Sequence, residues 1–146
     1  MALDPPGDPR GSCEEFEQQH RALLDRIDDA ARAAEAGDVA AARHALRWLR
    51  EQLLAHFAEE ESLMSSTRYP ERGRHRAAHE LFMQDFAQLS QELEASGLAP
   101  STARWIAVRV PEWFAFHVQV NDVPLERFLS SRRRPQEPSP GGTRSR

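Results

Sequence analysis

Residues 56–79, HFAEEESLMSSTRYPERGRHRAAH, hold two pairs of potential metal ligands on either side of a short break. His56 and Glu60 form the first pair, and His75 and His79 form the second. Residues four apart lie one turn above each other on one face of an α-helix, so each pair can grip one metal ion. Because two helices joined by a tight turn run antiparallel, both pairs can point into one interior. The stretch predicts a metal centre inside a helical bundle.

Apolar residues recur at helical spacing through most of the chain, and strand-like alternation is absent. The first helix is expected to begin at a capping box formed by Ser12 and Glu15. Glycines follow the expected ends of the first and third helices. The pattern predicts helices over about residues 12–36, 39–64, 70–95 and from 100 onward. Short links between long helices predict an all-α fold, an up-down-up-down four-helix bundle with the metal centre in its core.

The two ends of the chain differ in composition from its middle. Residues 1–11 are proline-rich, and residues 131–146 are rich in arginine, proline, serine and glycine. Such segments carry little apolar surface to bury. We therefore expect a disordered lead-in over residues 1–11, one bundle domain over residues 12–130, and a disordered basic tail over residues 131–146.

Composition narrows the classes of function. The chain has 146 residues and a net charge of -4, which fits one globular domain and gives no reason to expect nucleic acid. Its single cysteine, Cys13, excludes an intramolecular disulfide and fits a reducing compartment. The N-terminus lacks the apolar core of a secretory signal, and no apolar run reaches membrane-spanning length. We expect a cytoplasmic protein with no membrane partner; the sequence names no protein partner.

Five histidines and two carboxylates fall on the predicted inward faces of the four helices. A buried imidazole without a partner loses its hydration, and a buried carboxylate loses more, so an accidental polar core would be unstable. His44 stays outside this set, because it lies more than three turns from His56 along the same helix. The candidate metal ligands are His20, His56, Glu60, His75, His79, His117 and Asp122.

Imidazole with carboxylate suits iron, zinc, copper or manganese. Seven ligands exceed what one ion can take, so the sequence predicts two ions bridged by the two carboxylates and by an oxide or hydroxide. Counting about six positions on each ion leaves one position open, on the ion with fewer histidines. Such a centre can take one small exogenous ligand. Glu59 and Glu61 flank Glu60 in the sequence. Glu59 fits a solvated helix face, whereas Glu61 could contact a metal ligand from the side away from the metal.

The last ligand pair has unusual spacing, because His117 and Asp122 are five residues apart. At about 100° per residue they diverge by roughly 140° around an ideal helix, too far to share one face. The spacing predicts a local distortion, either a wide turn or a kink set up by Pro111 or Pro124.

These residues and their flanks resemble the hemerythrin family, in particular single-domain bacterial hemerythrins. The family pattern is a lone histidine, then His-x3-Glu, His-x3-His and His-x4-Asp. Here it reads EQQHRALLDRI, HFAEEESLM, HRAAH and HVQVND. A Tyr-Pro between the middle helices and a tryptophan shortly before the last histidine also match. The resemblance covers roughly Phe16 to Leu129.

The resemblance implies a non-haem di-iron centre that binds O2, or small anions in its place, at one open position. It implies that one iron takes His75, His79 and His117, that the other takes His20 and His56, and that Glu60 and Asp122 bridge them. It also implies an apolar pocket over the open iron, although ordinary core packing accounts equally well for any one of its members. The matching pocket positions are Leu23, Phe57, Trp113, Phe114 and Val118.

The leading hypothesis is a protein that binds O2 reversibly, as a carrier, store or sensor, and that is not an enzyme. The alternative is a di-iron enzyme acting on O2, peroxide or nitric oxide, or a carrier with weak oxidase or peroxidase side activity. A third class is a redox-sensing interaction module. The ligand set differs from that of ferritin-like oxygenases, which use mostly glutamates and Glu-x-x-His pairs.

Overall fold

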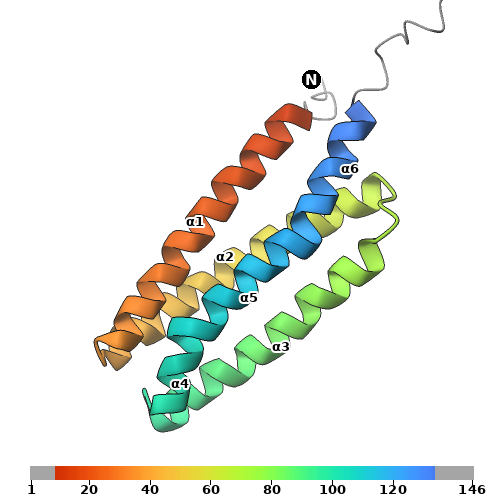
Figure 1. Ribbon diagram of the computed structural model, residues 1–146. Helices are drawn as coiled ribbons and strands as arrows, with labels where there is room; N and C mark the ends of the chain where they lie inside the picture. Colours follow the sequence, from red (N-terminus) through yellow and green to blue (C-terminus); the bar gives the residue numbers. More distant parts are fainter. Residues whose placement is uncertain (1–8, 134–146) are drawn as a thin grey trace, which may run out of the picture.

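The computed structural model describes residues 9–133, which are almost entirely helical and contain no strand. Three long helices are followed by a fourth rod made of five consecutive helical segments. Figure 1 shows the four rods side by side, each running opposite to the one before it in the chain. The all-α prediction is confirmed. The segments are α1 Pro9–Glu35, α2 Val39–Ser66, α3 Arg72–Ser96, α4 Pro100–Arg104, η1 Trp105–Arg109, α5 Val110–His117, η2 Val118–Asp122 and α6 Val123–Arg133, where η marks a π-helix.

The outer helix ends differ from the expected ones by a few residues. α1 begins at Pro9 rather than Ser12, and α6 ends at Arg133 rather than near residue 130. Residues 9–11 and 131–133, which were expected to be disordered, are therefore helical. The rest of the predicted lead-in and tail, residues 1–8 and 134–146, lies outside the described residues.

The turns between helices rest on local backbone chemistry. Asp38 caps α2, because its carboxylate accepts a hydrogen bond of 3.0 Å from the backbone N–H of Ala41. Gly37, just before it, adopts a φ of 72°, a left-handed conformation that costs glycine little. The sequence predicted that the third helix begins at about residue 70, with Pro70 in its first turn. The structure begins α3 at Arg72, so Pro70 lies in the turn before this helix.

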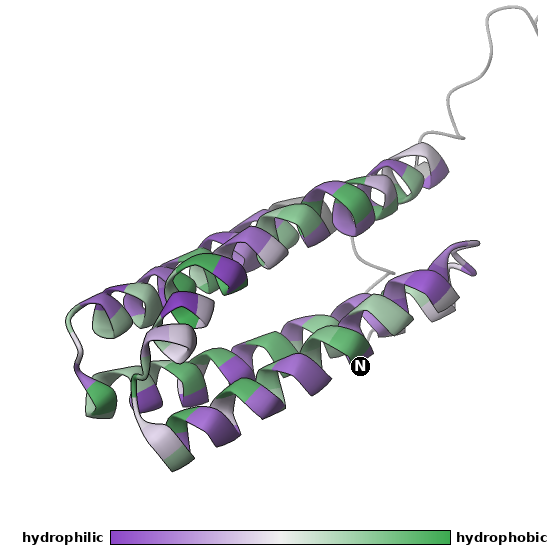
Figure 2. Cartoon of the chain, turned by 60° about the horizontal axis from the view of Figure 1, so that its bottom comes forward, coloured by the Kyte–Doolittle hydropathy of each residue, from purple (hydrophilic) through white to green (hydrophobic). Residues whose placement is uncertain are grey.

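The buried side chains form two apolar clusters with a polar layer between them. The larger cluster includes Leu23, Phe57 and Phe114, and the smaller includes Phe16 and Met64. Figure 2 shows hydrophobic and hydrophilic residues mixed along each rod, as amphipathic helices require. In three of the rods, a candidate ligand lies between a residue of one cluster and a residue of the other. Along the chain these residues are Phe16–His20–Leu23, Phe57–Glu60–Met64 and Phe114–Asp122–Leu125. Apolar packing on both sides therefore holds the polar layer in place.

Across residues 9–133, no helix combines enough length with enough apolar character to cross a bilayer.

Candidate metal centre

All seven predicted ligands meet in the polar layer, and all four rods contribute to it. α1 supplies one histidine, α2 and α3 supply two residues each, and the fourth rod supplies the last two. Six of the seven side chains are at most 3% exposed, and His20 keeps 12% of its side chain exposed. Within residues 9–133, the fold brings together the same seven side chains that the sequence predicted as ligands.

The cluster divides into two overlapping groups of potential ligands. Within each group, one ligand atom from every member lies within 4.8 Å of the others. Both groups contain the same two carboxylates, and each has its own histidines. The first group, called here the three-histidine group, is His75, His79 and His117 with Glu60 and Asp122; the second, the two-histidine group, is His20 and His56 with the same two acids.

Glu60 directs its two oxygens at different groups. Its Oε1 lies 3.0 Å from Nε2 of His79 and 3.4 Å from Nε2 of His75, both in the three-histidine group. Its Oε2 lies 3.2 Å from Nε2 of His56, in the two-histidine group. A carboxylate placed this way can bridge two ions, with one oxygen on each.

Asp122 repeats this arrangement from the opposite side of the bundle. Its Oδ1 lies 3.0 Å from Nε2 of His75 and 3.3 Å from Nε2 of His117. Its Oδ2 lies 3.0 Å from Nε2 of His20. Two independent carboxylates thus separate the same two sets of histidines.

These inward-facing atoms lack hydrogen-bond partners within the described residues. The orphaned atoms are Nε2 of all five histidines, Oε1 of Glu60 and both carboxylate oxygens of Asp122. They approach one another without hydrogen-bond geometry, and each unsatisfied buried polar atom costs about 1–3 kcal/mol. Lone pairs and negative charge converging at one place fit bound cations, and the donor set of imidazoles and carboxylates fits iron or a similar metal.

Two of the histidines are held from behind through their outward-facing nitrogens. Nδ1–H of His56 donates to Oε1 of Gln19 over 2.6 Å, and Nδ1–H of His79 donates to Oε2 of Glu61 over 2.9 Å. A proton on Nδ1 leaves the Nε2 lone pair free to bind a metal. Glu61 fits the sequence expectation, but sequence reasoning missed Gln19, whose only signal was its place beside His20.

The spacing of the last pair is accommodated by a π turn. In η2 the backbone N–H of Val123 bonds to the carbonyl of Val118, five residues earlier. The turn therefore closes over five residues and brings His117 and Asp122 onto one face. Regular α-helical bonding does not run through this segment, so the predicted distortion is confirmed.

A second π turn, η1, lies earlier in the fourth rod, where the backbone N–H of Val110 bonds to the carbonyl of Trp105. Each π turn is followed directly by a Val-Pro pair, Val110–Pro111 after η1 and Val123–Pro124 after η2. Proline has no N–H, and its ring crowds the carbonyl four residues earlier, so a wider turn relieves that clash. The distortion at Pro111 is therefore a π turn, and the rod continues through it into α5.

Electrostatics couple the members of the cluster. Burial raises the pKa of Glu60, but the three imidazoles that face it outweigh burial and lower this pKa to about 2. Facing imidazoles likewise outweigh burial at Asp122 and hold its pKa below the ordinary value. Burial lowers the pKa of His75, but Asp122 and Glu60 outweigh it and raise the pKa to about 9. At His117 burial prevails and the pKa is lowered. Both acids are therefore ionised and ready to bind cations.

Comparison with known protein families assigns the chain to one of them. The family model of the hemerythrin HHE cation-binding domain matches residues 13–123, which include every member of the cluster. The chain belongs to the hemerythrin family. The resemblance drawn from the sequence is thereby confirmed. A search of curated proteins finds no match.

The stability of this hemerythrin-family chain without metal should depend on pH. A histidine with a raised pKa adds stability below its ordinary pKa of 6.5 and loses that contribution as the pH rises through about 9. For His75 this loss amounts to about 3 kcal/mol. We expect the free energy of unfolding of the chelator-treated protein, measured with denaturant, to fall between about pH 6.5 and pH 9. An unchanged or rising value would contradict the ion pairing.

The π turn offers a test by deletion. A π turn equals an α-helix with one extra residue, so deleting the exposed Val120 should restore an α-helix with the last two ligands four apart. Residues four apart share a face, and the deletion variant should keep its metal content. Deleting the exposed Ala115, in the regular α5, should instead rotate His117 by about 100° and lower the metal content. Metal analysis compares the metal content of the two variants, and circular dichroism compares their helix content. Equal losses of metal would contradict the role of the π turn in placing His117 and Asp122 on one face.

The apolar residues expected around the open position divide between the two groups. Leu23 and His56 line a groove of about 160 Å³ between α1 and α2. The ring of Phe114 lies 5.9 Å from that of His20, centre to centre. Leu23 and Phe114 are 2% and 1% exposed, so both cover the two-histidine group with buried apolar surface.

Three other apolar residues of the expected pocket lie elsewhere in the core. Phe57 stacks on His79 with ring centres 3.8 Å apart, and its ring is also 6.0 Å from that of His56. Trp113 stacks on His117 at 4.8 Å. Val118 is half-buried against the larger apolar cluster. Trp113 therefore covers the three-histidine group, and Phe57 reaches both groups.

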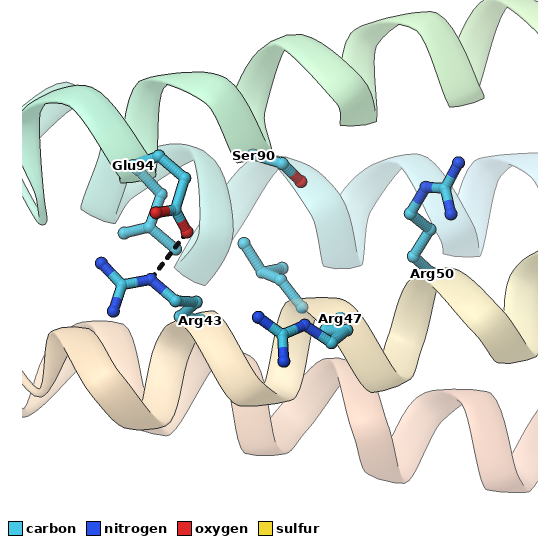
Figure 3. A pocket seen from close by; sticks show the side chains of 7 residues that line it. Arg43, Arg47, Arg50, Ser90 and Glu94 are labelled. Atoms are coloured by element: carbon cyan, nitrogen blue, oxygen red, sulfur yellow. Dashed lines mark hydrogen bonds and ion pairs between the residues drawn. The ribbon is translucent and has the colours of Figure 1, made fainter.

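A second hollow, of about 170 Å³, lies between α2 and α3 and is separate from the cluster (Figure 3). Arg43 bonds across it to Glu94, with 2.6 Å between Nε and Oε2. Its remaining lining consists of Leu46, Arg47, Arg50, Ser90 and Leu93. Three arginines repel a cation, so this hollow takes no part in the candidate metal centre.

Proposed function

We propose that this chain binds O2 reversibly at two iron ions, as a cytoplasmic carrier, store or sensor and not as an enzyme. One observation carries the proposal: each of two buried carboxylates turns one oxygen toward two histidines of the three-histidine group and the other oxygen toward one histidine of the two-histidine group. That arrangement suits two ions with unequal histidine ligation. Membership of the hemerythrin family favours iron over the other metals that imidazole and carboxylate accept.

The residues then take separate roles. His75, His79 and His117 would hold one iron, and His20 and His56 would hold the other. Glu60 and Asp122 would contribute oxygens to both, and the side with fewer histidines would leave room for O2 or a small anion. Such an iron pair would supply the electrons that reversible O2 binding requires.

The protein's own side chains decide whether O2 leaves unchanged. Leu23 and Phe114 cover the two-histidine group with apolar surface and offer no proton donor there. Excluding water from that side limits the supply of protons that would let reduced oxygen escape. These two side chains would thereby favour release of O2 in unchanged form.

Metal analysis combined with an oxygen electrode tests the proposal. We expect about two irons per chain, because one ion cannot use seven ligands. The reduced, iron-loaded protein should take up O2 in proportion to its amount and then stop. One zinc per chain without iron would overturn the metal assignment. Continuous O2 consumption in the presence of a reductant would favour the di-iron enzyme instead.

A further inference from the structure

The outward-facing nitrogens of two candidate ligands meet acceptors of different charge. His56, in the two-histidine group, donates its Nδ1–H to the neutral amide oxygen of Gln19 over 2.6 Å. His79, in the three-histidine group, donates its Nδ1–H to the carboxylate of Glu61 over 2.9 Å. The two groups therefore differ in what stands behind their histidines as well as in how many histidines they have.

The orientation of the Gln19 amide is fixed from its other end. Its Nε2 donates to Oε1 of Glu59 over 2.9 Å, which leaves the amide oxygen to face His56. An amide oxygen only accepts hydrogen bonds, so His56 must carry its proton on Nδ1. The two hydrogen bonds that link Glu59, Gln19 and His56 thus fix the tautomer of His56 and keep its unprotonated Nε2 facing the cluster.

Glu61 acts on His79 from a different direction. It lies two residues beyond Glu59 on α2 and reaches across to α3. His79 is 2% exposed and the Glu61 side chain 33% exposed, so the carboxylate closes the outer side of a buried imidazole. A hydrogen bond to a charged acceptor is stronger than one to a neutral amide, and it makes the imidazole a stronger donor to a metal.

We propose that Gln19 and Glu61 are positioning residues that give the two ions unequal electronic surroundings. Glu61 strengthens the histidine on the three-histidine ion and favours its oxidised state. Gln19 orients His56 without adding negative charge, which keeps the ion with the open position easier to reduce. The inference rests on the proposed iron pair.

Removal of the Gln19 amide tests the positioning role. Gln19→Leu should weaken metal retention about 10- to 100-fold, which is typical for loss of a partner behind a metal-binding histidine. Gln18→Leu changes an exposed neighbour in the same way and should keep the parental retention. Gln19→Glu combined with Glu59→Gln should restore retention, because the carboxylate at position 19 accepts the Nδ1–H of His56 and also accepts a hydrogen bond from the amide at position 59. Equal iron release from the Gln19→Leu and Gln18→Leu variants, measured against a chelator, would overturn the role of Gln19.

Exchange of the two acceptors tests the electronic role. Gln19→Glu combined with Glu59→Gln should lower the reduction potential of the two-histidine ion, and Glu61→Gln should raise that of the three-histidine ion. A spectroelectrochemical titration measures both, with Gln18→Leu as the control. No shift, or shifts of the same sign, would overturn this role.

The outcomes separate this inference from the proposed function. If the parent chain holds no iron pair, the proposed function fails. Zinc binding to the metal-depleted chain then still compares the Gln19→Leu and Gln18→Leu variants. A matching zinc affinity in the two variants would overturn the positioning of His56 as well.

Discussion

Removing either bridging carboxylate should abolish the paired metal centre: the Glu60→Ala and Asp122→Ala variants should retain roughly half of the parental iron or less. Each carboxylate faces both groups of histidines, so its loss would take a ligand from each of the two proposed ions at once. The remaining imidazoles would also lose the negative charge that draws them together, because both acids are ionised in the fold. Iron and protein analysis of the purified variants measures the effect.

Two matched variants separate loss of the bridge from loss of the fold. Glu60→Gln keeps the shape of the side chain but removes its charge, and it should also lose paired iron while its helix content remains parental. His44→Ala removes an exposed histidine and should keep about two irons per chain. If His44→Ala lost iron as severely as Glu60→Ala did, the assignment of the ligands would be wrong.

The second large effect concerns the apolar side chains that cover the two-histidine group. Leu23→Asn should speed the decay of the O2-dependent absorption band in air by roughly tenfold, which corresponds to about 1.4 kcal/mol in activation free energy. Leu23 is 2% exposed and lines the groove beside His56, so an amide there would hold water against the two-histidine group. Iron content should stay near parental, because no ligand is removed.

The neighbouring leucine supplies the control. Leu24 is 48% exposed, and Leu24→Asn should leave the decay rate unchanged. If the Leu23→Asn and Leu24→Asn variants decayed equally slowly, Leu23 would serve only as core packing.

Ligand spacing explains why so much of the site could be predicted from the sequence. His56 with Glu60, and His75 with His79, are four apart, and the periodicity of the α-helix alone places each pair on one face. The apolar stripes then direct those faces inward. The spacing between His117 and Asp122 fits no regular helix, so it predicted a distortion at its actual place.

Other features depend on contacts between helices, which periodicity does not encode. Gln19 meets His56 only because α1 packs beside α2 in one particular register. The stacking of Trp113 on His117 likewise depends on the rotamer that the surrounding core permits. The start of α1 at Pro9 was not predicted, because the capping box at Ser12 also marks a helix start, although proline is favourable in a first helical turn.

Reversible oxygenation is the central claim, and the visible spectrum of the iron-loaded protein tests it most directly. The protein would be reduced without air, exposed to O2, and then flushed with argon through several cycles. We predict a band that appears with O2 and disappears under argon, returning the reduced spectrum each time. Conversion to an oxidised spectrum at the first exposure, with no recovery under argon, would contradict the proposal.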